Sequence, residues 1–324
     1  MKNFKSFYTV ALVIFMIFTQ NLFAEENQLS LTLTTDAAYY PQSDRITGTD
    51  HFAPITGPYS GLEGCTTLYA DYKINTPLGE SWLVKDASVL FEGALEVTPI
   101  SVRPKASIEF QPLPFFVLKT GGSVGFGWNL GGIEGLCELN KVTCDYEKLS
   151  TFNHPFYEVW GSATFMFDTG AIISGDWTHV VMLATYKTFY TGIAGLDSDA
   201  VYEWQCSKGK ARGLQYEFQG ILGYQMPLTL SLAGFMFKST GHYNGADYAL
   251  FNDNYNGAFA ELTISPVMQF KFGAKDELYC LLDFSSRRSF DSKFEKEGES
   301  LYLTATGREW FFQRIAFSWT HKFM

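Results

Sequence analysis

Alternation of apolar and polar side chains at every second position is the feature that most constrains this chain. Residues 100–111 read ISVRPKASIEFQ, with apolar residues at the even-numbered positions and polar residues at the odd-numbered ones. Successive side chains of a β-strand lie on opposite faces, so this segment predicts a strand with one apolar face and one wet face. Segments 157–168, 214–226 and 260–272 repeat the pattern. A tilted strand of this length is long enough to cross a bilayer.

The pattern recurs often enough to predict an all-β fold, a transmembrane antiparallel up-and-down β-barrel of about twelve strands, within a range of 10–14. Long and short connections alternate, as in outer-membrane barrels with short turns on one side and long loops on the other; the short connection at 98–99 is the exception. The alternative is a soluble β-sandwich or ligand-binding barrel, whose strands also alternate. The predicted strands lie near 28–40, 65–76, 86–97, 100–111, 115–127, 156–168, 176–190, 212–225, 228–238, 257–272, 277–287 and 309–323.

The last twelve residues, QRIAFSWTHKFM, carry the most specific pattern. They alternate and place Phe323 next to the end of the chain, with His321 on the apolar face. This segment resembles the terminal strand of bacterial outer-membrane β-barrels of the porin-like class. The resemblance implies an integral location in the bacterial outer membrane, contact with outer-membrane lipid, and assembly by the barrel-assembly machinery.

The N-terminal segment predicts a signal peptide at 1–24 and a barrel domain at 25–324. Lys2 and Lys5 precede an uncharged apolar run at 8–18, and Ala24 precedes two glutamates. That order is typical of an export signal with a small residue at the cleavage site. The run is shorter than the roughly 20 residues that a membrane helix needs. An uncleaved membrane helix is therefore the weaker interpretation.

Composition supports the barrel and excludes one class of partner. The chain is 17% aromatic and only 18% charged, whereas soluble domains carry about 25% charged residues. After residue 18 there is no long uncharged apolar run of the kind a helical span requires. The formal net charge of −10 lacks the basic footprint of a nucleic-acid-binding protein, so no nucleic-acid partner is expected.

Twelve strands enclose an interior only slightly wider than side chains can fill. The polar faces place acids and bases in nearly equal number there, which favours either an ion-paired, partly plugged lumen or a narrow channel for small polar solutes. Arg103 and Lys105 form the densest basic spot, which either attracts an anion or pairs with nearby glutamates. The predicted lumen-lining residues are Asp71, Lys73, Glu92, Glu96, Arg103, Lys105, Glu109, Glu158, Glu217, Glu261, Lys271 and Arg314.

The cysteines suggest one local disulfide and no metal site. Cys137 and Cys144 lie seven residues apart in one long loop, and exported proteins meet an oxidising environment. No pair forms a CxxC motif, and no Cys/His cluster has zinc spacing. No metal and no cofactor are therefore expected.

Catalytic motifs are missing from the sequence, including GxSxG and HExxH. The prediction is that the protein is not an enzyme but a porin-like channel for small polar solutes. The first alternative is a surface-exposed barrel with a plugged lumen, whose long loops bind an extracellular partner. The second is an outer-membrane hydrolase, for which His179 and His242 are the candidate catalytic residues.

Overall fold

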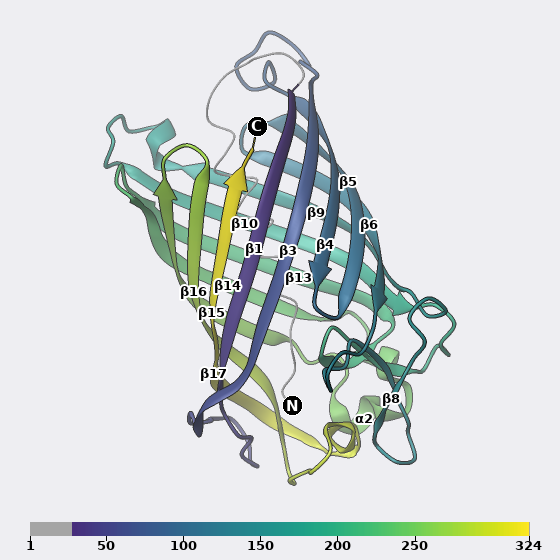
Figure 1. Ribbon diagram of the computed structural model, residues 1–324. Coiled ribbons are helices and arrows are strands. Elements are labelled where there is room, and N and C mark those ends of the chain that lie inside the picture. The colour runs from purple at the N-terminus through teal and green to yellow at the C-terminus, as the bar shows by residue number, and fades with distance from the viewer. Residues whose placement is uncertain (1–27, 324) are drawn as a thin grey trace.

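A computed structural model describes residues 28–323 of the protein, and the predicted signal peptide at 1–24 lies outside the described residues. Twelve antiparallel strands form one closed barrel (Figure 1), and each lies in the order of the chain beside the next. The prediction of an all-β barrel of twelve strands is confirmed. The barrel strands are β1 (Gln28–Gln42), β3 (Gly57–Asn75), β4 (Ser88–Thr98), β5 (Ser101–Leu113), β6 (Phe116–Gly127), β9 (Phe156–Asp168), β10 (His179–Ile193), β13 (Gly213–Gln225), β14 (Leu230–His242), β15 (Glu261–Phe272), β16 (Asp276–Phe290) and β17 (Ala305–Lys322).

The first and last strands close the barrel. β1 pairs with β17 in an antiparallel register that runs from Thr32 opposite Lys322 to Tyr39 opposite Ile315. Closure pairs the backbone groups that an open sheet edge would expose, which a structure surrounded by lipid requires. The alternating segment at the end of the chain is thus the strand that completes the cylinder.

The side chains on the outer surface are apolar, and those facing the interior are largely polar. On β13 and β14 the outward-facing Leu222 and Phe235 are 58% and 63% exposed. The neighbouring inward-facing Gln219 is buried, as is Glu217. A water-soluble protein has the opposite arrangement, with apolar groups packed inside. The alternation predicted from sequence is therefore that of a barrel with an apolar outer band.

The two ends of the barrel differ. At the end uppermost in Figure 1, β17 ends and the connections are short or moderate: 76–87, 114–115, 169–178, which contains η1 (Thr169–Ala171), 226–229 and 273–275. At the opposite end, the turn at 99–100 is short, as the sequence indicated. The other connections there are the long loops 43–56, 128–155, 194–212, 243–260 and 291–304.

The long loops carry secondary structure of their own, which the sequence pattern did not predict. Two of them form a separate four-stranded sheet, in the order β12-β11-β7-β8. We call this the loop sheet. Its strands are too short to show a clear alternation, and their pairing joins segments about 60 residues apart. The loop elements are β2 (His51–Phe52), β7 (Leu136–Leu139), β8 (Tyr146–Lys148), β11 (Val201–Trp204), β12 (Ser207–Ala211), η2 (Gly245–Phe251), α2 (Asn252–Tyr255) and η3 (Glu297–Tyr302).

The helical elements of the described chain are short. Between residues 28 and 323, none combines the length and the apolar character that a membrane-spanning helix needs.

Candidate functional site

The predicted lining residues lie on the inward-facing side of the barrel strands and are largely withdrawn from solvent. Four of them remain partly exposed: Lys73, Lys105, Glu261 and Lys271. The other eight are buried: Asp71, Glu92, Glu96, Arg103, Glu109, Glu158, Glu217 and Arg314.

Glu158 on β9 is the centre of the first ion-paired group. Arg103 Nη2 donates to Glu158 Oε2 at 2.9 Å, and Lys187 Nζ donates to Glu158 Oε1 at 2.7 Å. Arg103 Nε also donates to Ser123 Oγ at 2.8 Å. Both oxygens of one carboxylate are therefore bound by cations from two other strands. Charge-assisted bonds of this kind offset the cost of burying charge.

A second pair of ion contacts lies on β4, β5 and β6. Lys119 Nζ donates to Glu92 Oε2 at 3.0 Å, and Ser107 Oγ donates to Glu92 Oε1 at 3.0 Å. Lys105 forms an ion pair with Glu96. Of the two roles considered for Arg103 and Lys105, the structure shows internal pairing. We call the side formed by these paired residues of β4, β5, β6, β9 and β10 the charged wall; it comprises Glu92, Glu96, Arg103, Lys105, Lys119, Glu158 and Lys187.

Arg314 on β17 organises a further group across the seam of the barrel. Its Nε donates to Asp283 Oδ2 at 2.6 Å, and its Nη1 donates to Tyr40 OH at 3.1 Å. Tyr40 OH in turn donates to Glu63 Oε2 at 2.5 Å. Glu63 was missed because the strand was expected to begin at residue 65, whereas β3 begins at Gly57. Its parity, the same as that of Cys65, was the available signal.

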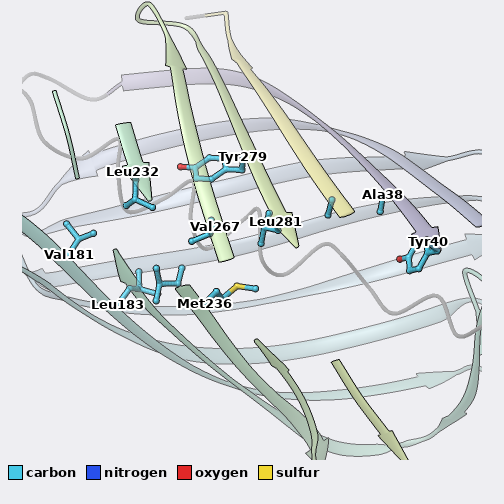
Figure 2. Close-up of a cluster of buried hydrophobic side chains, with 11 residues drawn as sticks. Ala38, Tyr40, Val181, Leu183, Leu232, Met236, Val267, Tyr279 and Leu281 are labelled. Atoms are coloured by element: carbon cyan, nitrogen blue, oxygen red, sulfur yellow. The ribbon is translucent and has the colours of Figure 1, made fainter. Parts of the chain in front are cut away.

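The strands on the opposite side of the interior carry a buried apolar cluster among polar residues such as Glu217, Gln269 and Asp283, which the sequence pattern did not predict. Inward-facing residues of β10, β13, β14, β15 and β16 pack into one buried cluster, seen in Figure 2 on neighbouring strands. We call this side the apolar wall; it comprises Val181, Leu183, Ile221, Leu232, Met236, Val267 and Leu281.

The hairpin of β11 and β12 folds into the mouth of the barrel. At its tip, Gln205 adopts a left-handed conformation (φ 50°). The side-chain Nε2 of Gln205 donates to Glu96 Oε1 at 2.9 Å and to Ser101 Oγ at 2.8 Å. The ring of Trp204 stacks on that of Phe156 with 4.6 Å between centroids. The hairpin is thus attached directly to the charged wall.

Close packing of Trp204 depends on a glycine in the barrel strand. A Cβ atom at Gly125 would lie 2.5 Å from the indole ring. Any larger residue at this position would push the hairpin out of the mouth. Gly125 on β6 therefore allows the hairpin to pack in the mouth of the barrel.

A chamber of about 180 Å³ remains between the hairpin and the barrel wall. Trp204 and Lys208 of the hairpin line it together with Arg103, Glu158 and Lys187 of the charged wall. Its lining includes seven lysine and arginine residues and five aspartate and glutamate residues. The enclosed space is therefore polar and carries an excess of basic groups.

A second cavity of about 310 Å³ lies nearer the rim, between loops 43–56 and 291–304. Arg45, Arg287 and Phe290 are among its lining residues. Arg288 and Gln313 line both cavities, so the two adjoin. Residues of β16 and β17 line both of these adjoining cavities.

The geometry assigns the structural class. A closed antiparallel cylinder with apolar groups outside and paired charges inside satisfies every requirement for a strand-built membrane span. The chain is a transmembrane β-barrel of the outer-membrane class.

The chain has a distant likeness to several solved structures. No family model and no curated protein matches the chain. The porin NanC is 10% identical, with 90% of this chain and 100% of that chain covered and a TM-score of 0.41. The β-domain of the Bordetella autotransporter BrkA is 8% identical, with 92% and 100% covered and a TM-score of 0.45. The outer-membrane channel DcaP of Acinetobacter baumannii is 12% identical, with 92% and 97% covered and a TM-score of 0.36.

The local disulfide expected between Cys137 and Cys144 is not formed. All five cysteines are free thiols. Cys137 lies within β7 opposite Lys148, whereas Cys144 lies in the turn beyond Asn140. The three residue steps along the strand from Cys137 to Asn140 span about 10 Å, beyond the reach of a disulfide. Spacing along the chain did not show this, because the hairpin register sets the separation.

The histidines considered for hydrolysis each pair with an aspartate. His179 Nδ1 lies 2.8 Å from Asp168 Oδ2, and His242 Nδ1 lies 2.8 Å from Asp247 Oδ2. The two pairs lie at opposite ends of the barrel. Within residues 28–323, neither ring forms a hydrogen bond with a serine, threonine or cysteine side chain. Neither pair therefore forms the nucleophile–base arrangement of a hydrolase.

Proposed function

We propose that this barrel is a porin-like channel for small polar solutes, with a preference for anions. The observation that carries the proposal is the polar chamber of about 180 Å³ that adjoins the rim cavity. A volume of this size holds about six water molecules at roughly 30 Å³ each, which limits the passage to small solutes. Because basic groups outnumber acidic ones in both linings, the local potential favours anions.

The paired charges give the channel a defined shape. Each cation of the charged wall is held by a carboxylate, so this part of the chamber keeps a fixed polar lining. The hairpin tip narrows the passage through its bonds to Glu96 and Ser101. We propose that the structure corresponds to a narrow state and that conduction increases when the hairpin leaves the mouth.

Single-channel recording of the refolded protein in planar bilayers tests the proposal. We expect small conductance steps and a reversal potential in a KCl gradient that indicates chloride preference. Replacing 201–211 by a short Gly-Ser linker should raise the conductance severalfold. A matched control replaces only the exposed turn residues Val142 and Thr143 by Gly-Ser and should leave conductance nearly unchanged. If neither the full protein nor the 201–211 variant conducts, the channel proposal is wrong.

One observation favours a second function, that of a surface barrel that binds an extracellular partner. Loop 128–155, which supplies two strands of the loop sheet, presents exposed apolar side chains, including Val142 at 92% and Phe152 at 80% exposed. Exposed apolar groups on a rigid platform are typical of interaction surfaces. This function predicts that neither the full protein nor the 201–211 variant conducts. It also predicts that partner binding is lost in a Val142→Ser, Phe152→Ser variant.

A further inference from the structure

The loop sheet contains a cluster of metal-binding side chain types that comes from both of its loops. Glu134 and Cys137 belong to loop 128–155, and Glu203 belongs to β11 in loop 194–212. One potential ligand atom from each of the three lies within 4.8 Å of the others. The pairing of β7 with β11 creates the cluster, because Cys137 lies directly opposite Glu203 in the register.

Glu203 is a buried carboxylate without hydrogen bonds. Its side chain is 0% exposed, and neither of its oxygen atoms accepts a hydrogen bond from the described residues. Burying a carboxylate without such bonds costs several kcal/mol. A bound cation would remove this cost, and the carboxylate already points at the other two ligands.

Lys208 is the competing cation in the structure. Its Nζ lies 3.7 Å from an oxygen of Glu203 and 3.7 Å from an oxygen of Glu134. These distances are too long for hydrogen bonds, and one ammonium group serves two carboxylates. The lysine side chain is flexible, so a metal ion can displace it without a change in the backbone.

We infer that Glu134, Cys137 and Glu203 form a binding site for a divalent transition metal, with zinc as the best fit. Zinc accepts thiolate and carboxylate ligands in a tetrahedral arrangement, and three protein ligands leave one position for water. The side chain of Glu134 is 24% exposed, which provides a path from solvent to the otherwise buried site.

Zinc binds cysteine as the thiolate, so a metal ion would bind Cys137 with release of the thiol proton.

A bound metal would connect the two loops that build the loop sheet. Its effect on conduction rests on the proposed channel function: a cross-link between loops 128–155 and 194–212 would hold the hairpin in the mouth. The binding site itself does not depend on that function.

Co²⁺ is the probe for the test, because a bound thiolate gives a charge-transfer absorption band that carboxylates alone do not. Refolded full-length protein is titrated with Co²⁺ in the presence of a reductant, and Zn²⁺ is then added to displace it. We expect a saturable band at one equivalent that Zn²⁺ abolishes. Cys137→Ser should remove the band, and Glu203→Gln should weaken Zn²⁺ binding by more than about 100-fold, since loss of an outer-shell partner alone costs 10- to 100-fold.

Matched controls lie in the hairpin of β7 and β8, which also contains Cys137. Cys144→Ser and Glu138→Gln change the same residue types outside the cluster and should leave binding within about twofold of the unmodified protein. Lys208→Gln removes the competing cation and should tighten Zn²⁺ binding. A closed barrel that is not boiled before electrophoresis in detergent migrates differently from the boiled, unfolded chain. A variant that keeps this difference has folded.

Absence of the band in the unmodified protein, or its persistence in Cys137→Ser, would overturn the site. Weaker binding in Lys208→Gln would also count against it. If the band behaves as expected and Zn²⁺ leaves the conductance unchanged, the site stands and its role in holding the hairpin is wrong. If the protein does not conduct at all, only the channel proposal fails.

Discussion

The charged wall and the apolar wall face the same interior yet are stabilised differently. On the charged wall, cations and carboxylates from different strands bind each other at 2.7–3.0 Å, as in the contacts of Glu158 with Arg103 and Lys187. On the apolar wall, Met236, Val267 and Leu281 pack into one buried hydrophobic cluster. In a narrow barrel, therefore, an inward-facing side chain is not always in contact with water.

Both sides contribute to the functional features. The hairpin of the loop sheet binds the charged wall through Gln205, whereas the chamber is lined by residues of that wall and by Met236, Glu261 and Asp283 of the opposite strands. Ion pairs hold their partners in fixed directions, so they define a shaped polar space. Apolar packing fills volume without direction and stabilises the rest of the cylinder.

The largest expected effect comes from breaking the charged wall. Glu158→Ala leaves Arg103 and Lys187 buried without their shared carboxylate. Loss of one partner of a buried ion pair costs about 3–5 kcal/mol. Urea unfolding of the refolded barrel in detergent should show this decrease in the free energy of unfolding. The exposed loop residue Glu147, replaced by Ala, is the control and should change the value by less than about 0.5 kcal/mol. Equal stability of the Glu158 variant and the unmodified protein would mean that water in the interior already screens these charges.

A cavity in the apolar wall should have a somewhat smaller effect. Met236→Ala removes a side chain that is 1% exposed and should lower the free energy of unfolding by about 2 kcal/mol. Met236→Leu conserves volume and should cost less than about 1.5 kcal/mol.

Salt distinguishes the two walls in the same unfolding experiment. Increasing ionic strength screens charges that face the chamber, though less strongly than exposed ones, and leaves apolar packing largely unaffected. The cost of Glu158→Ala should therefore depend on salt concentration, and that of Met236→Ala should not. The same dependence for both variants would contradict the division into two walls.

The smallest effect is expected at the hairpin tip. Gln205→Asn retains a residue type that tolerates the left-handed conformation but shortens the side chain so that it no longer reaches Glu96 and Ser101. Loss of these bonds should change the equilibrium between docked and undocked hairpin by about 1 kcal/mol, close to fivefold. Channel recordings should show more frequent open events, with global stability almost unchanged. Asn244→Asp, in loop 243–260 away from this contact, is the control and should gate like the unmodified protein.

The repeated two-residue period of the sequence predicted about twelve strands with one apolar and one polar face each, and the structure confirms twelve. The segment around Phe317 and Trp319, which resembles a terminal barrel strand, pairs with β1 to close the cylinder. The position of a strand and the face on which each of its side chains lies are local properties, because side chains two positions apart lie on the same face of a strand.

Only the tertiary structure decided which inward-facing residues meet. Val267 and Glu261 have the same parity on β15, yet one packs in the apolar wall and the other lines the chamber. The partner of Arg103 lies 55 residues away on β9. Cys137 meets Glu203 only because two loops pair as a sheet. Alternation fixes the face of a strand, whereas contacts across a lumen depend on barrel register and loop folding, which no short segment of sequence encodes.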